Sequence, residues 1–270
     1  MQPPPNPVIK TARIPDRNAL PELLALAAAA FAILLGGLVK GAVGLGAPLV
    51  AVPVLAAIYG VKTAIAVMTV PLIVSNIWQI WTYRATIEGR AMLKLLLVGC
   101  IGGVVLGTLL LGLLPEAWLA FFLALMLFVY LALALAKPSW MLAQPLAQKL
   151  ALPIGLVTGT LQGAAGLSTP VGATFIHAQR LGREAQVFAA SAMFFTLSTT
   201  QIIALVGIEV MTVELAAFSV AALVPIMLGV WLGQYLGARV GRKTFERLTL
   251  AVILAVALGL LAQSLPEILA

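Results

Sequence analysis

The stretch GGLVKGAVGLGAPL (Gly36–Leu49) places a lysine among glycines inside an otherwise apolar run. Glycine weakens a helix, proline interrupts one, and an ammonium group is costly in hydrocarbon. A second stretch, GLVTGTLQGAAGLSTP (Gly155–Pro170), repeats the glycine and proline pattern in the other half of the chain. We therefore expect two broken helices at related positions, and we expect these breaks to organise the fold.

The composition predicts a membrane protein. The chain has 270 residues, of which 62% are hydrophobic and 9% are charged, whereas a water-soluble domain carries about 25% charged residues. Apolar runs of about twenty residues recur along the chain, which is long enough to span a bilayer as helices. They lack the alternation of barrel strands. The fold class predicted is an all-α, multi-pass integral membrane protein with about 8–10 transmembrane or half-membrane helices.

Hydropathy and the positions of helix-breaking glycine and proline residues divide the chain into ten helical segments. These are expected at 21–40, 43–59, 64–83, 91–113, 116–136, 150–165, 168–180, 186–206, 213–237 and 248–265. The predicted organisation is a mobile tail (1–20), a first membrane repeat (21–136), a cytoplasmic linker (137–149), a second repeat (150–265) and a C-terminal tail (266–270). Each repeat then holds five segments.

The two halves resemble each other beyond the opening stretch. GLVKG at Gly37 matches GLVTG at Gly155, so that Lys40 falls opposite Thr158, and GLGAPLVA matches GLSTPVGA. Thr69 falls opposite Ser191, and Gln79 opposite Gln201. A glycine ladder occurs in both halves, for which we expect close helix packing: Gly99, Gly103 and Gly107, then Gly229, Gly233 and Gly237.

Loop charges predict the orientation of the halves. Loops 84–94, 137–149 and 239–247 hold most of the basic residues and should be cytoplasmic. An odd number of crossings per half gives the halves opposite orientations, which is the inverted repeat of many secondary transporters. By parity the N-terminus lies outside although its tail is basic. Either the tail violates the charge rule, or the first two segments form one broken crossing.

The duplicated breaks suggest an anion site. Helix N-termini present free N–H groups and the positive end of the helix dipole, so two such ends meeting at the midplane form an anion pocket. Ser168 and Thr169 would add hydroxyl donors, and Lys40 would add a cation. The alternatives are that the glycines serve only packing and that Lys40 extends to the interface.

The third and eighth segments carry polar stripes, which either line the transport path or bond neighbouring helices: Thr69, Ser75, Asn76 and Gln79, then Ser191, Thr196, Ser198, Thr199 and Gln201. Their amide side chains are costly in lipid and should face the protein interior. Together the candidate substrate-binding residues are Lys40, Gly44, Gly46, Ala47, Pro48, Thr69, Asn76, Gln79, Gly166, Ser168, Thr169, Pro170, Ser191, Ser198 and Gln201.

Other functional classes find little support. His177 is the single histidine and Cys100 the single cysteine, so no metal site and no disulfide within the chain are expected. An embedded hydrolase needs histidine or carboxylate groups within its helices, and no such constellation occurs. The net charge of +7 is scattered through the loops, which does not suit nucleic-acid binding. No organic cofactor is indicated.

These residues resemble the sulfite exporter TauE/SafE family, also called the toluene-sulfonate uptake permease family, over about residues 20–265. The resemblance rests on Gly44, Gly46, Val52 and Pro53 and on the second copy of this motif. The chain departs from the triple-glycine form of the motif, reading GAP and STP, and so looks like a divergent branch. The resemblance implies transport, with export expected, of sulfite, an organosulfonate or a related sulfur-containing or carboxylate anion across a bacterial inner membrane.

The leading hypothesis is a secondary carrier that alternates access between inverted halves, with the lipid bilayer and a small anion as its partners and a homo-oligomer as an open possibility. An anion channel is the nearest alternative, since it would use the same polar groups without saturation or counter-transport. Coupling to protons or sodium ions through hydroxyls and backbone carbonyls stays open.

Overall fold

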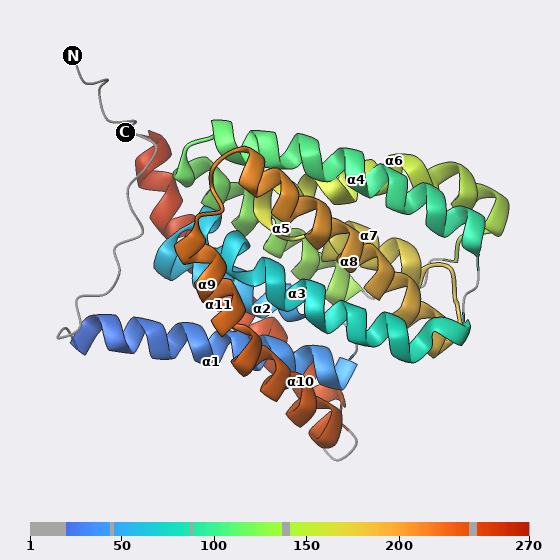
Figure 1. The fold of residues 1–270 in the computed structure, drawn as a ribbon, viewed down its shortest axis with the longest axis horizontal. Coiled ribbons are helices and arrows are strands. Elements are labelled where there is room, and N and C mark those ends of the chain that lie inside the picture. Colours follow the sequence, from blue (N-terminus) through green and yellow to red (C-terminus); the bar gives the residue numbers. More distant parts are fainter. Residues whose placement is uncertain (1–19, 44–45, 87–88, 137–140, 238–241, 270) are drawn as a thin grey trace.

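The structure is a computed structural model that describes residues 20–43, 46–86, 89–136, 141–237 and 242–269. Its helices are α1 (Leu20–Val43), α2 (Ala47–Tyr59), α3 (Val61–Tyr83), η1 (Arg84–Thr86), α4 (Arg90–Leu113), α5 (Glu116–Ala136), α6 (Gln144–Ala165), α7 (Thr169–His177), α8 (Arg183–Gly207), α9 (Val213–Ala221), α10 (Leu223–Gly237) and α11 (Arg242–Leu269). Figure 1 shows them as one bundle of helices.

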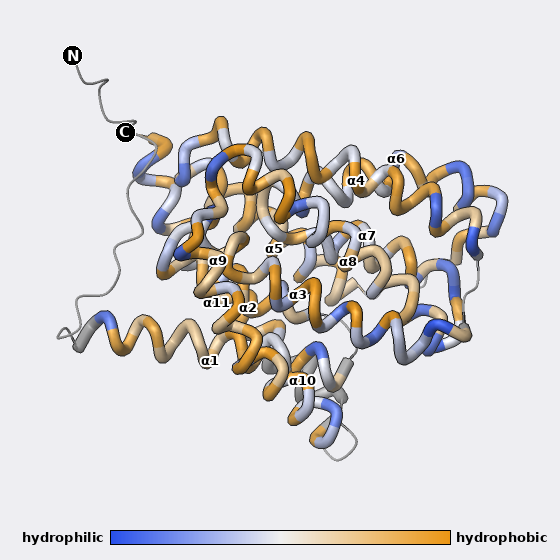
Figure 2. The backbone as a smooth tube through the Cα atoms, in the orientation of Figure 1, coloured by the Kyte–Doolittle hydropathy of each residue, from blue (hydrophilic) through white to orange (hydrophobic). Residues whose placement is uncertain are grey.

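The helices confirm the predicted class. Within the described residues, seven helical stretches are long and apolar enough to cross a membrane, and α2 is a shorter apolar helix. Hydrophobic residues cover most of the bundle, and hydrophilic residues gather near helix ends (Figure 2). The chain is therefore an all-α integral membrane protein.

Both predicted breaks are present. Helix α1 ends at Val43 and α2 begins at Ala47 with Pro48 in its first turn. Helix α6 ends at Ala165 and α7 begins at Thr169, again with a proline in the first turn. Proline is tolerated there because the first N–H groups of a helix have no intrahelical partner. The Gly–Pro stretches thus separate a helix from a shorter one in each half.

Some boundaries differ from those predicted. The segment expected at 213–237 divides into α9 and α10 at Ala222, because Pro225 cannot donate to the carbonyl of Ala221. Helix α6 begins at Gln144, inside the stretch predicted as a linker, and α11 continues to Leu269 through the stretch predicted as a tail.

Glycines bring α4 and α6 into backbone contact. A Cβ added at Gly103 would lie 2.1 Å from the carbonyl oxygen of Leu156, and one added at Gly159 would lie 2.3 Å from that of Cys100. Helices α1 and α10 meet in the same way, because a Cβ at Gly233 would lie 2.1 Å from the carbonyl oxygen of Leu38. The expected packing role is confirmed for Gly99, Gly103, Gly107, Gly229 and Gly233, and stays a prediction for Gly237.

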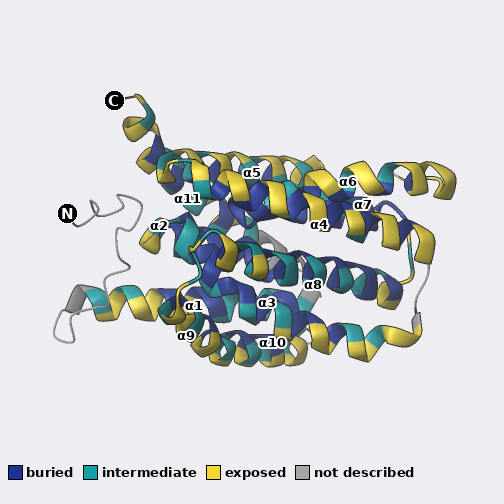
Figure 3. Cartoon of the chain, turned by 45° about the horizontal axis from the view of Figure 1, so that its top comes forward, coloured by how far each residue is buried: buried dark blue, intermediate teal, exposed yellow. Residues whose placement is uncertain are grey.

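The packing follows a pattern that exchanging the two halves leaves nearly unchanged. Helix α4 packs on α6, and correspondingly α10 packs on α1; α3 packs on α8, and α5 packs on α11. The α4–α6 and α1–α10 pairs lie on opposite sides of the bundle (Figure 1), and the largely buried α3 and α8 lie between them (Figure 3). Polar side chains near the middle of α3 and α8, such as Asn76 and Ser198, are buried, whereas Thr82, Arg183 and Glu184 near the helix ends are exposed.

Candidate functional site

Lys40 lies inside the bundle in the last turn of α1, immediately before the first break. Its side chain is only 3% exposed, and Nζ donates a hydrogen bond of 2.5 Å to Oδ1 of Asn76 on α3. Asn76 in turn donates from Nδ2 to the carbonyl oxygen of Leu72 at 2.7 Å. Within the described part of the chain, no carboxylate pairs with this ammonium group. The amine points into the protein and not toward the interface.

A second polar network lies at the break of the other half. Gln162 on α6 donates from Nε2 to Oε1 of Gln201 on α8 at 2.9 Å, and Gln201 donates back to the carbonyl oxygen of Gln162 at 3.0 Å. Ser168, the N-cap residue of α7, donates to Oε1 of Gln162 at 2.8 Å. All three side chains are buried. They join α6, α7 and α8 where the broken helix ends.

The two central helices are bonded across the halves. Ser191 on α8 donates to Oε1 of Gln79 on α3 at 2.8 Å, although the residues are 112 positions apart. Thr69 donates to the carbonyl oxygen of Ile65 within α3 at 2.7 Å. The predicted interior orientation is confirmed for Asn76, Gln79 and Gln201, which are buried. Thr69, Ser75, Ser191 and Ser198 are buried as well, whereas Thr196 and Thr199 are half-buried. Bonding between neighbouring helices accounts for part of both stripes.

The breaks themselves are held by glycines with left-handed backbone. Gly46 has φ 110° before α2, and Gly166 has φ 69° after α6, a region that other residues rarely adopt. A Cβ at Gly166 would lie 2.7 Å from Cγ1 of Ile65 and 3.2 Å from Cγ1 of Val52. The second break is therefore packed against α2 and α3 of the first half.

The remaining predicted residues are placed as follows. Five of them surround the breaks and are buried: Ala47, Pro48, Ser168, Thr169 and Pro170. Gly44 lies outside the described residues. The structure thus brings together two groups of predicted residues: Ser168 with Gln201 at the second break, and Lys40 with Asn76 near the first. Within the described residues, no hydrogen bond links one group directly to the other.

Sequence reasoning did not select Gln162 or Thr158. A glutamine four residues before Gly166 in an apolar helix is a usable signal, since amides are costly in lipid. In the sequence, Thr158 stands out only as the counterpart of Lys40. Four buried hydroxyl groups in this half have no hydrogen-bond partner within the described residues: those of Thr158, Thr169, Ser198 and Thr199.

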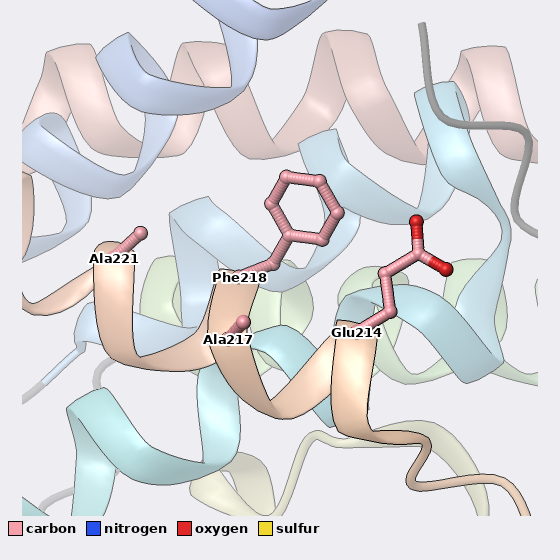
Figure 4. Close-up of a pocket in the computed structure, with 4 residues that line it drawn as sticks. All are labelled: Glu214, Ala217, Phe218 and Ala221. Atoms are coloured by element: carbon pink, nitrogen blue, oxygen red, sulfur yellow. The ribbon is translucent and has the colours of Figure 1, made fainter.

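Two surface hollows lie away from these networks. Figure 4 shows one along α9, lined by Glu214, Ala217, Phe218 and Ala221. The other lies between the ends of α2, α5 and α11 and includes Glu116 and Glu267. Neither hollow is lined by a predicted site residue. The side chains of both networks are buried, and neither hollow reaches them.

The fold and the buried polar groups define a multi-pass membrane protein of the kind that moves small solutes. The model of the family described as sulfite exporter TauE/SafE matches residues 29–260, and the chain belongs to this family. Membership makes it a membrane transporter of the sulfur-anion exporter type. The resemblance predicted from the motifs is thereby confirmed. No curated protein and no solved structure matches the chain.

Proposed function

We propose that this protein is a secondary carrier that exports a small anion across a bacterial inner membrane. The substrate class is sulfite, an organosulfonate or a related sulfur-containing or carboxylate anion, and the protein is not an enzyme. One observation carries the proposal: Lys40 is buried inside the bundle, and its hydrogen-bond partner is a neutral amide. The missing counter-charge is what an anionic substrate supplies.

The energetics of Lys40 favour this reading. Removing an ammonium group from water has an effective cost of several kcal/mol. The bond to Asn76 offsets part of that cost, since a hydrogen bond to a charged group contributes about 1.5–3 kcal/mol. An anion beside Nζ offsets more, because its attraction is weakly screened in a buried site. Lys40 therefore binds the substrate through its charge, and Asn76 positions the Lys40 ammonium group.

The helix starts at the breaks supply the other anion-binding groups. Helices α2 and α7 both begin in buried surroundings, at Ala47 and Thr169. The positive ends of their dipoles and their free N–H groups favour a negative ligand. Gly46 lets the backbone approach such a ligand closely, because it has no side chain. We assign these starts, with Gly44 and Ser168, to the substrate site.

Alternating access then follows from the duplicated architecture. The pairing of α4 with α6 and of α1 with α10 supports two related halves, whose five segments each give them opposite orientations. Rocking of one half against the other about α3 and α8 would open the buried networks to each side in turn. When a monoanion leaves a cell whose interior is negative, its free energy falls by about 2.3 kcal/mol per 100 mV of membrane potential. This driving force supports export without a coupled ion.

Transport by purified protein in liposomes tests the proposal. We expect uptake of radiolabelled sulfite to saturate and to be accelerated by unlabelled sulfite on the opposite side, which is counter-transport. Lys40→Met should abolish both. Lys94→Met is the matched control, because Lys94 is an exposed lysine of α4. Flux that never saturates and shows no counter-transport would indicate a channel, and full transport by Lys40→Met would remove Lys40 from the site.

A further inference from the structure

We propose that Thr158 and Ser198 form a second, uncharged binding position that donates hydrogen bonds to the oxygen atoms of the transported oxyanion. This inference rests on the proposed function and deepens it. It assigns different tasks to the two halves: Lys40 recognises the charge of the substrate, and the two hydroxyl groups recognise its oxygen atoms.

The internal repeat places this pair opposite Lys40 and Asn76. Aligning GLVKG with GLVTG puts Thr158 opposite Lys40. The pairs Thr69 with Ser191 and Gln79 with Gln201 are each 122 positions apart (191 − 69 and 201 − 79), and the same separation puts Ser198 opposite Asn76. In the first half, Lys40 and Asn76 are bonded to each other, from Nζ to Oδ1 at 2.5 Å.

The packing brings both residues to the same level of the bundle. Thr158 lies four residues before Gln162, and Ser198 lies three residues before its partner Gln201, so each lies one turn before the bonded glutamines. A Cβ at Gly172 of α7 would lie 2.6 Å from the methyl carbon of Thr158 and 2.7 Å from Sδ of Met193. Helices α6 and α8 therefore run in the same direction and both flank the first turns of α7.

Nothing in the described protein satisfies the hydroxyl groups at this level, and the buried hydroxyls of Thr108, Thr169 and Thr199 share this property. Thr158 is 0% exposed and Ser198 is 1% exposed, and the hydroxyl oxygen of each lacks a partner within the described residues. A helical threonine can bond the carbonyl four residues earlier; Thr160 does so to Leu156 at 2.9 Å. An unpaired buried hydroxyl costs about 1–3 kcal/mol, which a ligand would recover.

The surroundings favour the oxygens of an anion over a cation. Thr169, whose hydroxyl is also unpaired, opens α7, and the N-terminus of this helix carries partial positive charge. A cation would be repelled there, whereas hydroxyl and amide donors suit sulfonyl or carboxyl oxygens. Because the position carries no charge of its own, it discriminates between anions of equal charge by how many oxygens they present.

Binding to the purified full-length protein in detergent tests this division of tasks. The probes are sodium methanesulfonate and sodium bromide, which deliver monoanions with and without oxygen atoms, and the readout is the dissociation constant from thermal stabilisation. We expect Thr158→Val to weaken methanesulfonate binding about tenfold or more and to leave bromide binding unchanged. Ser198→Ala should act in the same direction if Thr158→Val fails to fold.

Two controls separate the possible failures. Thr160→Val has the same shape change two residues away, where the hydroxyl is already bonded, and should alter neither constant. Lys40→Met should weaken the binding of both methanesulfonate and bromide. If methanesulfonate binds and Thr158→Val and Ser198→Ala preserve the ratio of the two constants, the hydroxyls hold only structural water and the inference is wrong. The inference is also wrong if the position binds the cation, that is, if sodium salts stabilise the wild type more than choline salts do and the variants lose this difference. If no anion stabilises the wild type, the proposed function fails and the inference fails with it.

Discussion

Two neighbouring glycines on α4 offer a direct test of the close helix packing. A Cβ at Gly103 would lie 2.1 Å from the carbonyl oxygen of Leu156, whereas one at Gly102 would meet only Cδ1 of that leucine, at 3.6 Å. Ordinary contact begins at 3.4 Å, so Gly103→Ala must separate α4 from α6 by 1.3 Å (3.4 − 2.1). The obstacle is backbone, which no change of side-chain rotamer relieves.

The magnitude follows from comparing the two alanines. Both gain the same helix propensity, about 1 kcal/mol over glycine, so this gain cancels between them. The difference in free energy of unfolding is then the overpacking cost, about 1–3 kcal/mol, with Gly103→Ala the less stable variant. Reversible unfolding in mixed detergent, followed by tryptophan fluorescence, measures it. Equal stabilities of the two variants would contradict backbone contact between α4 and α6.

Three further predictions follow from the same structure. Gly233→Ala should melt at a lower temperature than Gly102→Ala, because its Cβ would lie 2.1 Å from the carbonyl oxygen of Leu38, and equal melting temperatures of these two alanine variants would contradict close packing of α1 on α10. Asn76→Asp should give Lys40 an internal counter-ion. We therefore expect a higher melting temperature without ligand and anion binding, measured by calorimetry, that is at least tenfold weaker. Unchanged anion binding would refute the role of Lys40. Gln201→Leu should lower the free energy of unfolding by about 1–3 kcal/mol, because it leaves Nε2 of Gln162 buried without a partner, and undiminished stability would count against that network.

The features set by local chemistry could be predicted from the sequence. Pro48 and Pro170 lack an N–H group, so a helix start at each was readable without knowledge of any neighbour. The spacing of Gly99 and Gly103 indicated a packed face in the same way. Pro225 carried a similar signal within the ninth expected segment, and the break at Ala222 that accompanies it was not predicted.

Pairings between distant residues could not be predicted. Lys40 and Asn76 are both candidates from the sequence, but their bond depends on where packing places α1 relative to α3, which neither segment determines alone. Gln162 and Gln201 lie 39 positions apart and on different helices. The unpaired hydroxyls of Thr158 and Ser198 become visible only when all neighbouring acceptors have been placed.

We propose that the protein carries a small anion with Lys40 in its binding site. Current recorded from protein-containing vesicles on a solid-supported membrane, after a rapid rise in sulfite concentration, tests this claim most directly. We predict a transient current whose sign is that of entering negative charge, which saturates with sulfite, is absent in Lys40→Met and persists in Lys94→Met. An equal current from Lys40→Met, or no current from the wild-type protein with any anion of the proposed class, would contradict the account.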